Sequence, residues 1–376
     1  MILTYYFTFF KDMQMNNFKN HIFDEFSLDL WDYLKAVKKP ILIYGMGNGA
    51  DKIISVLSSY GIEYADVFAS DEFVRGHSFH GKVVLSYSQA REKYADFIIL
   101  LSFGTHLPDV MERIYELNEI HELYAPDVPV CQGEIFTSAF FEKNASSLEM
   151  ARNSLYDEKS RLIFDDIIRF KLTGRIKYLE STEVQEKEIN TFLSYDNYEK
   201  ILDLGAYNGD TAKKFIGLCS NLKEIHAFEP DFRNFKKLNA FASEQDFPKV
   251  FAYNYASWDT DTTLQFSASG NRNSSGIGTP SHQTKLVEIL AKRPDGVIDS
   301  VDFIKYDVEG AEYKAITGSR RLIEESSPDL LVSMYHRSED LYELPLLIKN
   351  LNPKYKLILR RLPCIPAWDL NLYAIS

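Results

Sequence analysis

Two glycines follow a short apolar run in "ILDLGAYNGDTAKKF", which begins at Ile201. The spacing Asp203-x-Gly205-x-x-x-Gly209 predicts a strand, a tight turn and a helix. Glycines in such a turn let the backbone approach a ligand closely, and an acid before the first glycine suits a cationic group. Tyr207 stands where a dinucleotide fingerprint needs its second glycine. The turn therefore does not fit the pattern of a nicotinamide-binding enzyme.

A second acid follows at the end of the next predicted strand. About two dozen residues after the turn, "HAFEPD" ends that strand with Glu229. A carboxylate there can accept hydrogen bonds from both hydroxyls of a ribose. S-adenosylmethionine (SAM) has an ammonium group and a ribose with free 2′ and 3′ hydroxyls, so it matches both acids. The alternative is a glycine turn that serves chain geometry, with Glu229 as a solvated acid.

More acids gather in "VDFIKYDVEGAEYKAITG". An apolar strand ends there in Asp307, which Glu309 and Glu312 follow closely. Ligands of open α/β sheets lie outside the carboxyl ends of the strands, which places these acids beside the predicted SAM site. Three acids so close would repel unless one faces a cation, a hydroxyl or a helix N-terminus. Glu312 alternatively favours only the first turn of the next helix.

The stretches "DLGAYNGDT", "HAFEPD", "IKYDVEGAE" and "MYHR" resemble the successive motifs of the FkbM family of SAM-dependent O-methyltransferases. The resemblance covers roughly residues 179–376 and implies methyl transfer to a hydroxyl of a sugar or a polyketide-like natural product. One departure is "KRPDGVIDS", which stands where the family often has an "LDD" element. The residues expected to bind the cofactor are Asp203, Gly205, Ala206, Tyr207, Asn208, Gly209, Asp210, Thr211, Glu229, Pro230 and Asp231.

Methyl transfer from a sulfonium needs an aligned oxygen and a group that accepts its proton. His336, at the end of the fifth strand, is the expected general base, with Asp307 as the orienting group or the alternative base. His336 can instead be a structural histidine. Glu309, Asn271 and Arg272 are the expected substrate contacts, the last two in a polar loop at 267–283 that is either a lid or a plain loop. We expect no metal site, although Asp307, Glu309 and His336 could cluster around Mg²⁺.

An earlier turn, "YGMGNGA", does satisfy G-x-G-x-x-A through Gly45, Gly47 and Ala50. Asp71, after the second strand, is placed to meet a ribose. The loop "VRGHSFHGKVV" resembles small Rossmann-like domains of sugar acyltransferases and polysaccharide enzymes, which implies recognition of a nucleotide sugar or a phosphate. The expected substrate contacts in this domain are Gly45, Gly47 and Asp71. Two rivals remain: an NAD-dependent oxidoreductase, which lacks a Tyr-Lys or Cys signature here, and a binding module without catalysis.

Composition limits the classes of function. The chain has 376 residues with a net charge of −12 and pI of about 5.3, so we expect no nucleic-acid partner. Its three cysteines lack metal-ligand spacing and suit a reducing cytoplasm. The apolar N-terminal run is too short to span a membrane and is a poor signal peptide. The expected partner is a small-molecule or glycan acceptor, and a homo-oligomer stays open.

Alternating strand and helix patterns predict an α/β protein with two Rossmann-like domains. The expected division is a substrate-recognition domain at 1–132, a helical connector at 133–195 and a methyltransferase domain at 196–376. Seven strands are expected in the last domain, the final two as an antiparallel hairpin around "LPCIPAWD". This is the seven-stranded sheet of class I methyltransferases.

Overall fold

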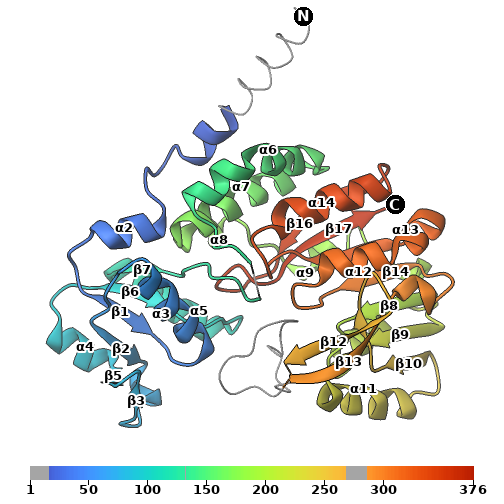
Figure 1. Ribbon diagram of the computed structural model, residues 1–376, viewed down its shortest axis with the longest axis horizontal. Helices are drawn as coiled ribbons and strands as arrows, with labels where there is room; N and C mark the ends of the chain where they lie inside the picture. The colour runs from blue at the N-terminus through green and yellow to red at the C-terminus, as the bar shows by residue number, and fades with distance from the viewer. Residues whose placement is uncertain (1–16, 132, 268–285) are drawn as a thin grey trace, which may run out of the picture.

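The computed structural model describes residues 17–131, 133–267 and 286–376. Two α/β regions lie side by side, and a group of helices lies between them (Figure 1). The first sheet has the order β5-β2-β1-β6-β7, and all its pairs are parallel, as predicted. Its strands are β1 (Ile41–Tyr44), β2 (Asp66–Ala69), β5 (Leu85–Ser86), β6 (Ile98–Leu101) and β7 (Glu122–Tyr124).

The central strands of this sheet are buried along their whole length because helices cover both faces. The covering helices are α2 (Leu30–Ala36), α3 (Asn48–Ser59), α4 (Tyr87–Lys93) and α5 (Pro108–Ile120). In α3, the side chains of Ala50, Ile53 and Leu57 recur at helical spacing and form the buried stripe. A short turn, η1 (Asp71–Phe73), and a small hairpin of β3 (Ser78–Phe79) and β4 (Lys82–Val83) follow β2.

The predicted connector is helical. It consists of α6 (Ser138–Ser154), α7 (Glu158–Thr173), α8 (Lys177–Glu180), α9 (Glu186–Ile189) and η2 (Tyr195–Asn197). Most of α7 is buried, and the Ser160 hydroxyl accepts a hydrogen bond from the Leu359 N–H of β16 at 2.9 Å. These helices therefore pack against the second sheet.

The second sheet has seven strands in the order β10-β9-β8-β14-β15-β17-β16. The first five are mutually parallel, and β17 lies antiparallel between β15 and β16, so the predicted C-terminal hairpin is present. The strands are β8 (Lys200–Leu204), β9 (Glu224–Phe228), β10 (Lys249–Tyr253), β14 (Phe303–Tyr306), β15 (Asp329–Ser333), β16 (Lys356–Arg361) and β17 (Leu370–Ile375). The accompanying helices are α10 (Asp210–Leu218), α11 (Phe232–Glu244), α12 (Glu312–Gly318), α13 (Arg320–Ser326) and α14 (Asp340–Leu351).

Two features differ from the sequence prediction. A third sheet of β11 (Ala256–Ser257), β12 (Thr262–Ser267) and β13 (Leu286–Lys292), followed by η3 (Pro294–Gly296), lies beside the second sheet. The predicted lid and its residues Asn271 and Arg272 lie between β12 and β13, outside the described residues. Helix α14 starts four residues before the predicted Leu344 and contains Pro345, which removes one backbone N–H donor from the interior of the helix.

The two α/β regions meet directly. The loop after β6 pairs with the loop between β16 and β17 through two backbone hydrogen bonds between Thr105 and Ile365, of 2.8 and 2.9 Å. At Gly104, a Cβ atom would stand 2.0 Å from the Trp368 ring, so only glycine permits this approach. The carboxyl ends of both sheets thus face a shared space. Among the described residues, no helix is long and apolar enough to cross a membrane.

Candidate functional site

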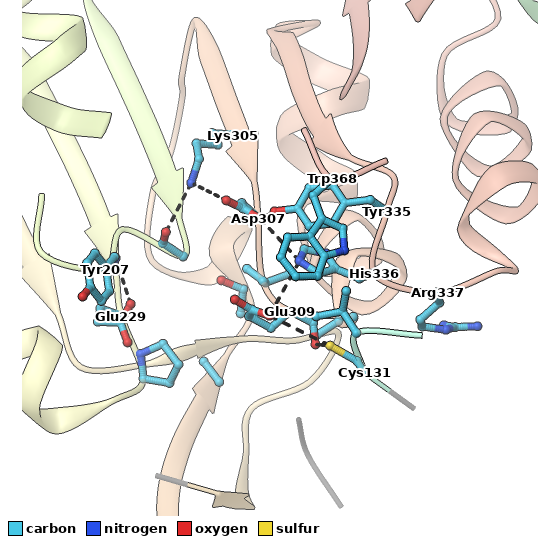
Figure 2. Close-up of a pocket in the computed structure, with 18 of the residues that line it drawn as sticks. Cys131, Tyr207, Glu229, Lys305, Asp307, Glu309, Tyr335, His336, Arg337 and Trp368 are labelled. Carbon is cyan, nitrogen blue, oxygen red and sulfur yellow. Dashed lines mark hydrogen bonds and ion pairs between the residues drawn. The ribbon is translucent and has the colours of Figure 1, made fainter. Parts of the chain in front are cut away.

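A pocket of about 860 Å³ opens between the two regions. Six of the eleven predicted cofactor residues line it: Gly205, Tyr207, Asp210, Thr211, Glu229 and Pro230. The first region contributes Gly104, Thr105, His106, Val130, Cys131 and Gly133. The ends of β14 and β15 contribute Asp307, Glu309, Tyr335, His336 and Arg337 (Figure 2). The three acidic and glycine motifs of the second region therefore converge on one cavity.

The turn after β8 needs its glycines for backbone reasons. Gly205 and Gly209 both have φ of 86°, a conformation that favours glycine. A Cβ on Gly205 would stand 1.8 Å from the backbone oxygen of Asp307, and one on Gly209 would stand 2.7 Å from the Phe241 ring. Tyr207, with φ of 48°, is left-handed without being glycine. Close packing against the end of β14 thus explains Gly205, and packing against α11 explains Gly209, while the turn still borders the pocket. Ala206 and Asn208 belong to the turn without lining the pocket.

Glu229 ends β9 with its carboxylate held by two backbone donors. The Tyr207 N–H donates to Oε2 at 2.9 Å, and the Asp231 N–H donates to Oε1 at 2.8 Å (Figure 2). Each oxygen keeps a further lone pair for a ligand. Burial raises the pKa of Glu229 to about 8, against the opposing effect of the two N–H groups. The Asp231 side chain instead caps helix α11, where it accepts from the N–H groups of Arg233 and Asn234.

Asp203 has a cationic partner within the chain. The Lys305 ammonium lies 3.3 Å from Asp203 Oδ1 and 3.5 Å from Asp307 Oδ2. Burial lowers the pKa of Lys305, but these two carboxylates raise it by more, so the lysine stays charged. Asp203 is 1% exposed and does not line the pocket. The sequence reasoning missed Lys305, although a lysine within the fully buried strand β14 was a visible signal.

His336 lies among carboxylates rather than beside a free pocket wall. Its Nε2 is 3.7 Å from Asp307 Oδ1 and 3.7 Å from Glu309 Oε2, and its Nδ1 is 2.9 Å from Glu312 Oε1. The contact with Glu312 has an ion-pair distance without hydrogen-bond alignment. Burial lowers the pKa of His336, but the three carboxylates raise it by more, to about 10. The ring is therefore protonated at neutral pH, and a protonated imidazole does not accept a proton.

The two acids that follow Asp307 differ in exposure. The Glu309 side chain is 31% exposed and borders the pocket, and burial raises its pKa to about 7. The Glu312 side chain is fully buried, and its Oε1 accepts a hydrogen bond from the Val308 N–H at 2.8 Å. Donor atoms of Asp307, Glu312 and His336 all lie within 4.8 Å of one another, a spacing that can hold a metal ion. The sequence-based expectation of no metal site did not take into account that the Glu312 side chain is buried beside Asp307 and His336.

Several pocket residues were not among the predicted site residues. The Tyr335 hydroxyl donates to Asp307 Oδ1 at 3.1 Å and so fixes that carboxylate from the side opposite Lys305. Trp258, which follows β11, and Trp368, in the β16–β17 loop, both line the pocket. Cys131 donates its Sγ–H to the Glu309 carbonyl at 2.9 Å, which ties the first region to the acidic loop. Only the folded chain brings these distant segments together.

The residues predicted for substrate binding in the first region lie elsewhere. Gly45, Gly47 and Asp71 do not line this pocket. A Cβ on Gly45 would stand 2.6 Å from the Phe103 ring, which gives this glycine a packing role. The Asp71 carboxylate accepts hydrogen bonds from the hydroxyl and the N–H of Ser88 at 2.5 and 3.2 Å. A phosphate-binding role for this turn stays a prediction.

Residues 203–355 match the family model of the methyltransferase FkbM domain. No curated protein matches the sequence. Among solved structures, the chain is similar in fold to a methyltransferase FkbM from Methylobacillus flagellatus KT, at 20% identity and a TM-score of 0.70 over 96% of this chain and 99% of that one. More distant is a fibrillarin from Aeropyrum pernix with natively bound S-adenosyl-L-methionine, at 14% identity and a TM-score of 0.33 over 49% and 69% of the two chains. The predicted resemblance of the first region to sugar-modifying enzymes finds no support in these matches.

Proposed function

We propose that this chain is a SAM-dependent O-methyltransferase that acts on a hydroxyl of a sugar, a glycan or a related natural product. The observation that carries the proposal is Glu229, a buried strand-end carboxylate with two lone pairs left for ribose hydroxyls. The FkbM domain match at 203–355 and the mixed second sheet with its C-terminal hairpin support it.

The cofactor would lie along the glycine turn. Its ribose hydroxyls would donate to Glu229, and its amino-acid end would lie near Gly205 and the first turn of α10, where Asp210 and Thr211 line the pocket. Because Lys305 already neutralises Asp203, we assign Asp203 to positioning the strand end rather than to the cofactor ammonium. This placement directs the methyl group toward the end of β14.

Asp307 is the group that we assign to the acceptor hydroxyl. Both residues line the pocket, but the Asp307 side chain is 32% exposed and the His336 side chain only 1%. In the reaction the acceptor oxygen attacks the methyl carbon, the carbon–sulfur bond breaks, and S-adenosylhomocysteine leaves. The chain's task is alignment of the oxygen and removal of its proton. His336 as the general base stays a prediction that turnover measurements must decide.

The acceptor side of the pocket favours a polyhydroxylated ligand. Trp258 and Trp368 offer aromatic faces for the apolar side of a sugar ring. Glu309, Glu339 and Asp369 also line the pocket, and carboxylates accept hydrogen bonds from hydroxyls. The loops of the first region that line the pocket support a role for residues 1–132 in acceptor recognition, with 133–195 as connector and 196–376 as the catalytic domain.

Turnover tests this proposal. The chain is incubated with methyl-labelled SAM and a panel of sugars and polyhydroxylated compounds, and S-adenosylhomocysteine and methyl ether formation are measured. We expect a methyl ether for at least one acceptor, with loss of product in Asp307→Asn. SAM binding without turnover on any acceptor would instead favour a binding module, and hydride transfer with NAD would refute the assignment.

A further inference from the structure

Asp307, Glu309 and His336 meet at the wall of the pocket (Figure 2), and the buried Glu312 contacts the His336 ring. We call Asp307, Glu309, Glu312 and His336 the acid–histidine cluster. It contains three carboxylates and one imidazole, so its negative charge exceeds its positive charge even when the ring is protonated. The nearest cation outside the cluster is the Lys305 ammonium, 3.5 Å from Asp307 Oδ2.

That lysine cannot balance the cluster, because it is shared with Asp203 at 3.3 Å. Arg337, which directly follows His336 in the chain, pairs with other carboxylates: its guanidinium nitrogens lie 3.6 Å from Glu339 Oε2 and 3.2 Å from Glu343 Oε2. Carboxylates placed this closely need a further cation or a shared proton. Among the groups that the structure describes, the cluster therefore has more negative charge than its neighbouring cations neutralise.

The Glu312 side chain gives a second indication of a missing ligand, independent of the charge balance. Its side chain is fully buried, and only Oε1 is used, by the Val308 N–H and the His336 ring. Oε2 has no hydrogen-bond partner among the described residues. A buried carboxylate oxygen without a partner is costly, and such an atom usually marks a missing ligand, ion or water.

The distances fit a metal ion. Donor atoms of Asp307, Glu312 and His336 lie within 4.8 Å of one another, and Glu309 Oε2 is 3.7 Å from His336 Nε2. Two ligands that are each about 2.1 Å from an ion stand roughly 3–4 Å apart, so small side-chain rotations close the site. We propose that a divalent metal ion binds between Asp307, Glu312 and His336, whose ring releases a proton to solvent when it binds the ion, with Glu309 closing the site on the pocket side. One imidazole with carboxylates suits Mn²⁺ or Zn²⁺ better than Mg²⁺.

The role of this ion rests on the proposed methyl transfer. With Asp307 engaged as a ligand, the ion would take over its role by lowering the pKa of the acceptor hydroxyl, whose proton would pass to water. The oxygen then attacks the methyl carbon of SAM, the carbon–sulfur bond breaks, and its electron pair stays on the sulfur of S-adenosylhomocysteine. The ion would also hold the acceptor oxygen next to the methyl group. Access is from the pocket, because Asp307 and Glu309 are each about one-third exposed.

Metal binding is measured directly on the full chain after chelator treatment, by loss of the free Mn²⁺ electron paramagnetic resonance signal, with Zn²⁺ and Mg²⁺ as competitors. We expect one Mn²⁺ per chain, displaced more readily by Zn²⁺ than by Mg²⁺. Asp307→Asn and Glu312→Gln should each weaken binding by at least about tenfold. Glu309→Gln, at a partly exposed position that tolerates change, gives the same test if a buried substitution prevents folding.

The control is Glu229→Gln, which removes a carboxylate from the same pocket outside the cluster. It should lower SAM affinity and leave Mn²⁺ binding unchanged, whereas Glu312→Gln should do the reverse. Absence of metal binding to the folded wild type, or binding that none of the three cluster substitutions weakens, would overturn the metal site. Loss of SAM binding alone would count against the proposed function and leave the metal site standing.

Discussion

Replacement of Glu229 by alanine should weaken SAM binding more than any other single change in the glycine turn or the end of β9. In the structure, one lone pair on each carboxylate oxygen is used by a backbone N–H, of Tyr207 and of Asp231, and one on each is left. Above the pKa of Glu229, about 8, two ribose hydroxyls can therefore donate to a charged acceptor. Hydrogen bonds to a charged group contribute roughly 1.5–3 kcal/mol. The affinity of Glu229→Ala for SAM should therefore fall by at least about 10- to 150-fold, the loss that corresponds to one such bond.

Isothermal titration calorimetry with SAM measures this change, after circular dichroism and a melting curve show that the variant is folded. The matched control is Glu224→Ala, because Glu224 begins the same strand β9 and pairs with Lys200 at the surface. That variant should bind SAM like the wild type. A folded Glu229→Ala with unchanged SAM affinity would show that the ribose lies elsewhere, and the assignment of the cofactor site would be wrong.

Three further outcomes are expected. Burial raises the pKa of Glu229 to about 8, and hydroxyl donors favour its ionised form. The affinity of the chain for adenosine, which does not titrate near neutral pH, should therefore rise about fivefold from pH 7 to pH 8 and level off at higher pH. Glu229→Gln should abolish this pH dependence. Gly205→Ala should lower the free energy of unfolding by more than about 2 kcal/mol in urea titrations, since its Cβ would stand 1.8 Å from the Asp307 carbonyl oxygen, whereas Gly217→Ala, in open space on α10, should not destabilise. Asp307→Asn should lower kcat by about 10²- to 10⁴-fold with SAM affinity nearly intact, and a larger loss in His336→Asn than in Asp307→Asn would return the role of base to the histidine.

The strand and turn patterns were sufficient to predict the second sheet. Apolar runs that end in Asp203, Glu229 and Asp307 place those acids at one edge of a parallel sheet, and the structure has that arrangement. The third sheet was not predicted because its strands β12 and β13 contain few buried apolar residues and flank a polar segment.

Side-chain partners were the part that spacing could not supply. The sequence offered Asp203 to a ligand's ammonium, but Lys305 from the neighbouring strand takes that place because β8 and β14 pair in register at these two residues. The position of His336 at a strand end made it a plausible base. Its charge, however, depends on Glu312, which lies five residues after Asp307 and is fully buried against the ring. The contribution of Thr105 and Cys131 to the pocket depends on how the two α/β regions dock, which no local pattern encodes.

Equilibrium binding of SAM to the wild-type chain tests the central claim most directly. We predict one SAM molecule per chain by calorimetry, displaced by S-adenosylhomocysteine and adenosine and unaffected by NAD. A folded chain that binds NAD and fails to bind SAM would contradict the account.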